Sequence, residues 1–250
     1  MSWRQTFKTN AGRLHHLFLY GAIDPPRFYV FEDQQLVFID NPKVASTSVK
    51  KALFRDLKYD ALGQEPFHRL LEGRAALHVP KRALKYRYFT IVRNPFSRLV
   101  STYRDKVEGR PAEDWGVFNV KFYRLVFQHV GKLQRDQAAV SFNDFAMAVS
   151  RIPDWLSDRH IASQTRWKNR IGPSANVNLL KFETLSEDWE LLRQSHDLPA
   201  LDVLNRTPEA DWRPYYRDQA VIDAVSHRYH SDIEAFDYPI PEPARALCES

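Results

Sequence analysis

Three short apolar runs, rich in β-branched and aromatic residues, recur along the chain. They cover residues 35–40, 88–92 and 177–182, and runs of this length and composition are typical of buried strands. Between them, apolar residues repeat at helical spacing. The pattern predicts helices over residues 49–57, 118–130, 142–149, 186–194 and 217–236, and another that begins at Pro95.

The alternation of strands and helices predicts the class of the fold. It indicates an α/β domain of P-loop-like type, with a central parallel sheet flanked by helices and ligands at the carboxyl ends of the strands. The sequence contains no repeat, low-complexity tract or obvious linker. We therefore expect one domain over residues 1–250, with an irregular lead-in over 1–34 and a core over 35–240.

The loop after the first predicted strand is suited to anion binding. It combines small and hydroxyl-bearing residues with one lysine, directly before a helix. Unpaired backbone N–H groups at a helix start carry partial positive charge, so a strand, a loop and a helix start can together hold phosphate or sulfate. The candidate binding residues are Pro42, Lys43, Val44, Ala45, Ser46, Thr47 and Ser48.

A second segment has the same strand-to-helix layout. Arg93 ends the apolar run 88–92, Pro95 stands where a helix would begin, and Ser101 follows about two turns later. Arginine offers a planar fork that binds phosphate with two hydrogen bonds, whereas lysine acts as a mobile point charge. If the sheet is parallel, Lys43 and Arg93 face the same crevice.

The two segments together resemble a known pair of motifs. The Pro-Lys-x-Ala-Ser-Thr-Ser loop and the Arg-x-Pro-x-x-Arg-x-x-Ser pattern are similar to the nucleotide-binding motifs of sulfotransferases that use 3′-phosphoadenosine-5′-phosphosulfate (PAPS). The closest resemblance is to carbohydrate sulfotransferases of the chondroitin and HNK-1 type. It extends over residues 36–238, although this chain has Asn94 where Asp is common and Ala45-Ser46 where Gly-Cys is frequent.

The resemblance implies a reaction and a division of roles. The loop would bind the 5′-phosphosulfate of PAPS, while Arg93 and Ser101 would bind its 3′-phosphate. The sulfuryl group would pass to a carbohydrate hydroxyl, on an acceptor that could be an acidic glycan, and adenosine 3′,5′-bisphosphate (PAP) would be released. By the logic of phosphoryl transfer, Lys43 would stabilise the bridging oxygen. We expect no metal site.

The general base is harder to identify, because several residues could accept the proton of the acceptor hydroxyl. His78 is the first candidate, since some glycan sulfotransferases of similar layout place their catalytic histidine between the two nucleotide motifs. His160 is the second, and His68 and Glu183 compete with them. Each could instead serve an ordinary structural hydrogen bond.

Net charge and one mixed segment bear on the acceptor. The formal net charge of +5 and the pI near 9.2 are consistent with a polyanionic ligand but do not identify it. The stretch from Trp155 to Arg170 is aromatic and basic. It has two interpretations, as an acceptor surface or as a core helix with a solvated basic face.

Cysteine content suggests a compartment. Cys248 is the only cysteine of the sequence, so no internal disulfide can form. The apolar run from Leu17 to Ile23 is too short to cross a bilayer. We expect a cytoplasmic bacterial enzyme without an integral membrane segment; a Golgi-lumenal enzyme whose anchor is missing from this chain would look similar.

Two other functions fit parts of the pattern. A nucleoside-triphosphate-dependent kinase could share the fold, but the loop lacks the Gly-Lys-[Ser/Thr] ending of a Walker loop and a clear magnesium carboxylate. A non-enzymatic module could bind polyanions through its basic surface. No nucleic-acid-binding motif is visible, so we expect no nucleic-acid partner.

Overall fold

The computed structural model describes residues 3–57, 64–111, 114–115, 121–133, 139–171, 175–201 and 211–244. The chain divides into two compact units. The first, here called the sheet unit, comprises Pro26–Arg93 and Arg166–Pro208. The second, here called the helical unit, comprises Met1–Pro25, Asn94–Thr165 and Glu209–Ser250. That the chain works as a single domain stays a prediction.

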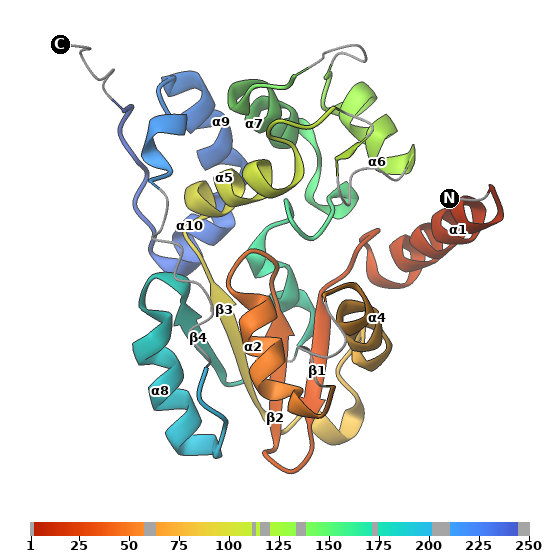
Figure 1. Cartoon of the computed structure of the whole chain (residues 1–250), viewed down its shortest axis with the longest axis vertical. Coiled ribbons are helices and arrows are strands. Elements are labelled where there is room, and N and C mark those ends of the chain that lie inside the picture. Colours follow the sequence, from red (N-terminus) through yellow and green to blue (C-terminus); the bar gives the residue numbers. More distant parts are fainter. Residues whose placement is uncertain are drawn as a thin grey trace. The chain divides into compact units, whose positions relative to one another are not determined.

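A four-stranded sheet forms the centre of the sheet unit, with the order β1-β2-β3-β4 (Figure 1). Strands β2 (Leu36–Asp40), β3 (Arg87–Val92) and β4 (Val177–Lys181) run parallel. The three predicted strands and the α/β class are confirmed. The sheet is not wholly parallel, because β1 (Arg27–Phe31) pairs antiparallel with β2 through a short hairpin.

The predicted irregular lead-in over residues 1–34 is wrong for most of its length. Helix α1 spans Trp3–Tyr20, and β1 lies within the same stretch. Apolar and polar residues of this helix are not clearly separated onto two faces, and some apolar side chains are exposed, such as Phe18 at 88% exposure. The sequence therefore shows little helical periodicity. The Asp-Pro-Pro sequence at 24–26 is typical of a turn. Because it directly precedes β1, the strand was not recognised from the sequence.

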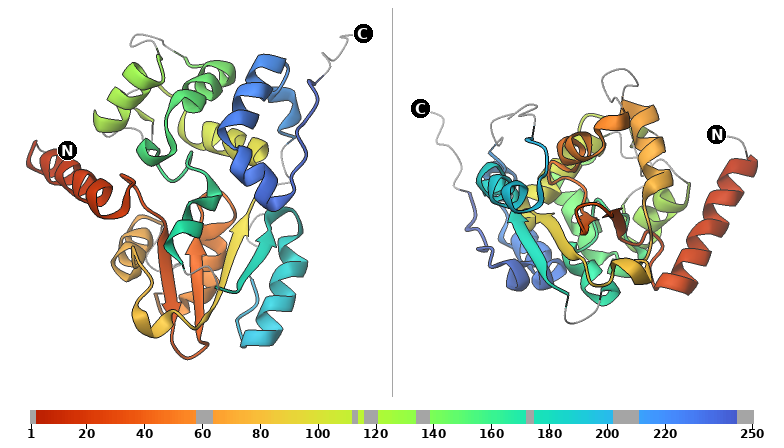
Figure 2. Two further views of the ribbon diagram at one scale, coloured as in Figure 1. Left: turned by 180° about the vertical axis from the view of Figure 1, so that it is seen from behind. Right: turned by 90° about the horizontal axis from the view of Figure 1, so that it is seen from below.

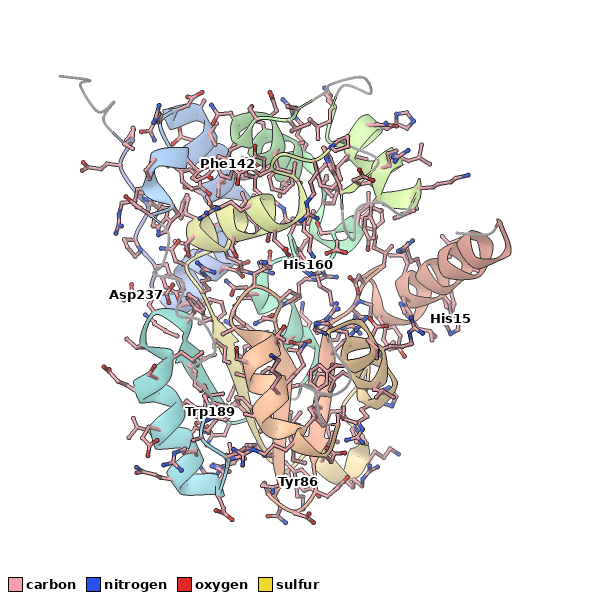
Figure 3. All side chains as sticks on the ribbon, in the orientation of Figure 1. His15, Tyr86, Phe142, His160, Trp189 and Asp237 are labelled. Carbon is pink, nitrogen blue, oxygen red and sulfur yellow. The ribbon has the colours of Figure 1, made fainter. Side chains whose placement is uncertain are left out.

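Both faces of the sheet are covered within the sheet unit. Helices α2 (Ser46–Leu53), α4 (Gln64–Arg74) and α8 (Leu185–His196) pack on one face. On this face the rings of Phe38 and Phe89 are stacked, with their centroids 4.8 Å apart. Trp189 of α8, labelled in Figure 3, meets the Phe89 ring edge-on. The 3₁₀ turn η2 (Lys81–Ala83) and Trp167 cover the other face. Short turns η1 (Arg55–Leu57) and η8 (Phe182–Thr184) complete the unit.

The helical unit is built around a single large apolar cluster. Within it, α7 (Phe142–Arg151) packs against α5 (Pro95–Lys106) and α9 (Gln219–Arg228), and the left view of Figure 2 shows these helices as neighbours. In the described part of this unit lie also α1, α6 (Lys121–Leu125), a π-helical turn (Val126–Val130), η6 (Asp154–Leu156), η9 (Arg213–Tyr215) and α10 (His230–Phe236). The turn η7 (Gln164–Arg170) links the two units along the chain.

The predicted helices agree with the structure in part. The helices over 142–149 and 186–194 are confirmed, and that over 118–130 is confirmed from residue 121, where the described part begins. The single helix over 217–236 is wrong, because Tyr229 leaves helical geometry and separates α9 from α10. Its buried hydroxyl donates to the carbonyl of Ile161, a tertiary bond that periodicity cannot reveal. The stretch from Trp155 to Arg170 is not one core helix either, since η6 and η7 flank an irregular segment.

Helix α5 starts with a side-chain cap followed by proline. The Asn94 amide oxygen accepts from the backbone N–H groups of Phe96 at 2.9 Å and Ser97 at 3.4 Å. Pro95 occupies the first helical position, where no N–H is needed. The cap and the proline explain why the predicted start at Pro95 is confirmed. Asparagine serves here as aspartate would, since both side chains cap helices well.

Substitution of Asn94 tests this cap. We expect Asn94→Ala to lower the free energy of unfolding by about 1 kcal/mol, because two N–H groups at a buried helix start lose their acceptor. Asn94→Asp is the matched control and retains the acceptor oxygen. Urea unfolding of the three proteins provides the measurement; equal stability of wild type and Asn94→Ala would show that the cap contributes nothing.

Candidate functional site

The carboxyl ends of β2 and β3 lie next to each other in the sheet unit. Parallel pairing continues to Ile39 opposite Thr90, so the chain leaves both strands at the same edge of the sheet. Asn41 fastens the beginning of the loop to β3: its amide donates to the Thr90 hydroxyl and to the Ile91 carbonyl, each at 3.1 Å. The loop from residue 41 to α2 therefore has a fixed origin.

Two residues of this loop adopt a conformation that L-amino acids rarely use. Lys43 has φ 69° and Ala45 has φ 60°, both in the left-handed region. Each stores about 1 kcal/mol of strain for a residue other than glycine. Val44, which lies between them, is completely buried in the apolar core. Left-handed residues before a helix start are a feature of backbone nests that bind anions.

A buried ion pair lies under the loop and was not predicted. The Asp40 carboxylate, at the end of β2, accepts from the Lys50 ammonium at 2.9 Å and from the Ser46 hydroxyl at 2.5 Å. The side chains of Asp40 and Lys50 are 2% and 9% exposed. The Ser46 hydroxyl is thus engaged within the protein, and the contribution that Ser46 can make to an anion is its backbone N–H. Thr47 and Ser48 are half-buried on the first turn of α2.

Arg93 lies beside the loop, as the parallel sheet predicted. Its Nη1 donates to the Lys43 carbonyl at 3.2 Å, and its guanidinium carbon lies 4.2 Å from the centroid of the Phe182 ring. The aromatic face of Phe182 restricts the position of the guanidinium. The structure therefore brings Arg93 together with the loop that carries Lys43.

The helix after Arg93 belongs to the helical unit. Ser101 is half-buried on α5. Arg98 of the same motif is completely buried, and its two terminal nitrogens donate at 2.8 Å to the carbonyls of Ala162 and Arg159. The two arginines of the Arg-x-Pro-x-x-Arg pattern thus have different environments, and Arg98 supports a segment distant in sequence.

That segment, residues 158–165, is irregular up to the start of η7 and is extensively hydrogen-bonded by side chains. Besides Arg98, the Thr102 hydroxyl donates to the His160 carbonyl at 3.1 Å, and Tyr229 donates to the Ile161 carbonyl at 2.8 Å. The buried Asp232 carboxylate accepts from the backbone N–H groups of Gln164 and Thr165. A segment held in this way can position a functional side chain accurately.

His160, labelled in Figure 3, is paired with a carboxylate within this segment. Its Nδ1 lies 2.5 Å from Asp158 Oδ1, and its backbone N–H donates to the same oxygen at 2.8 Å. Burial acts to raise the pKa of Asp158, but His160, with a smaller effect of Arg159, lowers that pKa to about 2. A carboxylate at Nδ1 leaves Nε2 of the imidazole as the atom that can exchange protons with a ligand.

The other candidate bases lie in the sheet unit. His78 is exposed, in the segment between α4 and η2. His68 is half-buried on α4, with its ring against that of Phe67, and Glu183 is exposed in η8. Among these candidates, His160 has a carboxylate hydrogen-bonded to its ring.

The chain as a whole was compared with known proteins. The model of the sulfotransferase family matches residues 26–239. The chain belongs to the sulfotransferase family. The resemblance seen in the two motifs is thereby confirmed, and the matched region contains the loop, Arg93, Ser101 and the segment 158–165.

Two curated relatives give the comparison more detail. Carbohydrate sulfotransferase 12 from Mus musculus is 30% identical over 193 residues, which cover 68% of this chain and 44% of that protein. Carbohydrate sulfotransferase 10 from Danio rerio is 30% identical over 251 residues, which cover 86% of this chain and 67% of that protein. The chain thus spans less than half of the mouse protein. No solved structure matches it significantly.

None of the helices in the described part of the chain combines the length and the apolar character needed to cross a membrane. Among the same residues, no three His, Cys, Asp or Glu side chains gather so that they could hold a metal ion. The expectation that the reaction needs no metal stays a prediction.

The lowered pKa of Asp158 predicts a dependence of stability on pH. The folded-state pKa of about 2 lies below the ordinary value of 3.8, so this carboxylate stabilises the fold above pH 4 and loses its contribution as the pH falls from 4 to 2. We expect Asp158→Asn to lower the free energy of unfolding by roughly 1–3 kcal/mol at pH 6 and by much less near pH 2.5.

Urea unfolding between pH 2.5 and 6 measures this difference. Glu234→Gln is the control, because it removes an exposed carboxylate of α10 and should give a small effect. A gap between wild type and Asp158→Asn that stays constant over this pH range would contradict the prediction.

Proposed function

We propose that the protein is a PAPS-dependent sulfotransferase that transfers a sulfuryl group to a hydroxyl of a carbohydrate. Membership of the sulfotransferase family supports the reaction class, and the names of the two relatives support the class of acceptor. The observation that carries the proposal is the meeting of Arg93 with the loop of Lys43 at the carboxyl ends of β2 and β3.

The proposed donor site assigns one end of PAPS to each motif. The backbone N–H groups of residues 43–48 and the Thr47 and Ser48 hydroxyls bind the 5′-phosphosulfate, helped by the partial positive charge at the start of α2. This helix has no acidic residue in its first turn. Arg93 and Ser101 bind the 3′-phosphate, for which the guanidinium offers paired donors.

The chemical step is a direct transfer. The acceptor oxygen forms a bond to sulfur while the bond from sulfur to the oxygen of the 5′-phosphate breaks, and PAP leaves with the electron pair. The acceptor proton passes to a general base, so the products are the sulfate ester, PAP and one proton. Lys43 balances the charge that develops on the bridging oxygen.

His160 and His78 remain the proposed bases. The pairing with Asp158 supports His160, because a carboxylate at Nδ1 stabilises the imidazolium that forms when Nε2 takes a proton. The position of His78 between the two motifs supports the alternative.

We keep a cytoplasmic bacterial location as part of the proposal. The support is compositional: with Cys248 alone, the sequence can form no internal disulfide.

Titration with nucleotides tests the donor site. We expect calorimetry to show that PAP binds wild type tightly and that AMP and ATP bind much more weakly at the same salt concentration. Arg93→Ala should reduce the preference for PAP over AMP, and Arg93→Lys should restore it only in part, because lysine lacks the paired donors. Lys43→Ala should remove most transfer to carbohydrate.

Equal affinity for ATP and PAP, together with metal-dependent ATP turnover, would favour a kinase instead. Strongly salt-dependent binding of polyanions without selectivity for the 3′-phosphate would favour a binding module.

Paired histidine substitutions test the base. We expect His160→Gln to reduce kcat for transfer by about 10²- to 10⁴-fold, the usual contribution of a general base, and His78→Gln to reduce it by less than tenfold. Transfer of ³⁵S from labelled PAPS to unsulfated chondroitin and other unsulfated glycans provides the assay. A larger loss in His78→Gln would assign the base to His78.

A further inference from the structure

The buried carboxylate of Asp40 has no assigned role in sulfuryl transfer. It lies at the last position of β2, directly before the proposed donor loop, with 2% of its side chain exposed. An acidic group so close to a proposed anion site opposes ligand binding unless its charge is compensated. We therefore expect Asp40 to have a role whose benefit outweighs its repulsion of an anionic ligand.

The partners of Asp40 indicate that function. Its two oxygens accept from Ser46 and Lys50, which are four residues apart and so lie on the same face of α2. One carboxylate at the end of a strand therefore holds two successive turns of the helix. This fixes the direction in which the first turn of α2 presents its backbone N–H groups.

Lys50 neutralises the charge of Asp40 and also makes one of the two contacts between Asp40 and α2. Its ammonium is 2.9 Å from Asp40 and 5.9 Å from the centroid of the buried Tyr29 ring. The pair is neutral as a unit, so Lys43 and the helix start still give the loop a positive character. The left-handed conformations of Lys43 and Ala45 make such support necessary, because strained backbone persists only where its surroundings determine it.

We propose that Asp40 is a positioning residue of the donor site, which holds the first turn of α2 so that the loop 42–48 faces the 5′-phosphate, with Lys50 cancelling its charge. This inference rests on the proposed function. It assigns a role to Asp40 and Lys50, which both lie outside the two nucleotide motifs.

The change in PAP affinity caused by Asp40→Asn distinguishes a positioning role from a purely electrostatic one, because the two predict changes in opposite directions. The substitution removes one negative charge next to a proposed anion site, so electrostatics alone predicts tighter binding of PAP. Positioning predicts weaker binding, because an amide holds Ser46 and Lys50 less firmly than a carboxylate. We expect the dissociation constant for PAP to rise about tenfold, within the range of couplings between contacting residues.

Comparison with 3′-AMP locates the effect at the 5′ end. This nucleotide carries the 3′-phosphate and lacks the 5′-phosphate, so its affinity should change less than twofold in Asp40→Asn. A general loss of folded structure would weaken both ligands equally. Calorimetric titrations at a temperature well below the melting transition of each variant provide the measurement.

Three further variants complete the test. Lys50→Met should weaken PAP binding more than Asp40→Asn, because it leaves the carboxylate uncompensated. The double variant Asp40→Asn/Lys50→Met should bind PAP better than Lys50→Met alone. Glu32→Gln is the matched charge control: Glu32 binds Arg82 and Tyr86 at the β1–β2 hairpin, and its loss should leave PAP affinity unchanged.

The outcomes distinguish this inference from the proposed function. PAP binding by Asp40→Asn that equals or exceeds wild type would overturn the positioning role and leave the proposed function intact. Absence of PAP binding in wild type would overturn both. If Asp40→Asn does not fold, Ser46→Ala replaces it, since that variant removes one contact with Asp40 and keeps the ion pair; unchanged PAP affinity in Ser46→Ala would equally overturn the role.

Discussion

Parallel pairing between β2 and β3 is the constraint on which the candidate site depends. It brings together two loops that are about fifty residues apart in sequence, and it makes both leave the sheet at the same edge. The hydrogen bonds of Asn41 to Thr90 and Ile91 extend this pairing beyond the last strand residues. Without that register, Arg93 would not reach the Lys43 carbonyl, and the two motifs would remain separate features of the sequence.

The charged residues around these motifs differ in how deeply they are buried. Asp40 and Lys50 neutralise each other in the interior, whereas Lys43 and Arg93 are only half-buried. In the helical unit, Arg98 is buried and donates to backbone carbonyls. The second motif therefore contains one arginine suited to a ligand and another suited to the architecture. Its Arg-x-x-x-x-Arg spacing alone does not tell the two apart.

Local patterns predicted the parts of the fold that local forces determine. The runs 35–40, 88–92 and 177–182 became strands because β-branched and aromatic residues suit a buried sheet, and Pro95 began a helix because Asn94 caps it. The break at Tyr229, the antiparallel pairing of β1 and the Asp40–Lys50 pair were missed because each depends on a partner that sequence spacing does not identify. For the buried pair, the sequence did offer one clue, because an acidic residue, Asp40, comes just before the proposed anion-binding loop.

The irregular segment 158–165 has a consequence for the order of folding. Its backbone is bonded to side chains from residues 24, 98 and 102 and from residues 229 and 232, more than sixty positions further along the chain. With little regular structure of its own, it cannot acquire its native form from neighbouring residues alone. During synthesis it must wait for α9 and α10 to emerge, so His160 reaches its native environment only after the chain has been translated beyond Phe236.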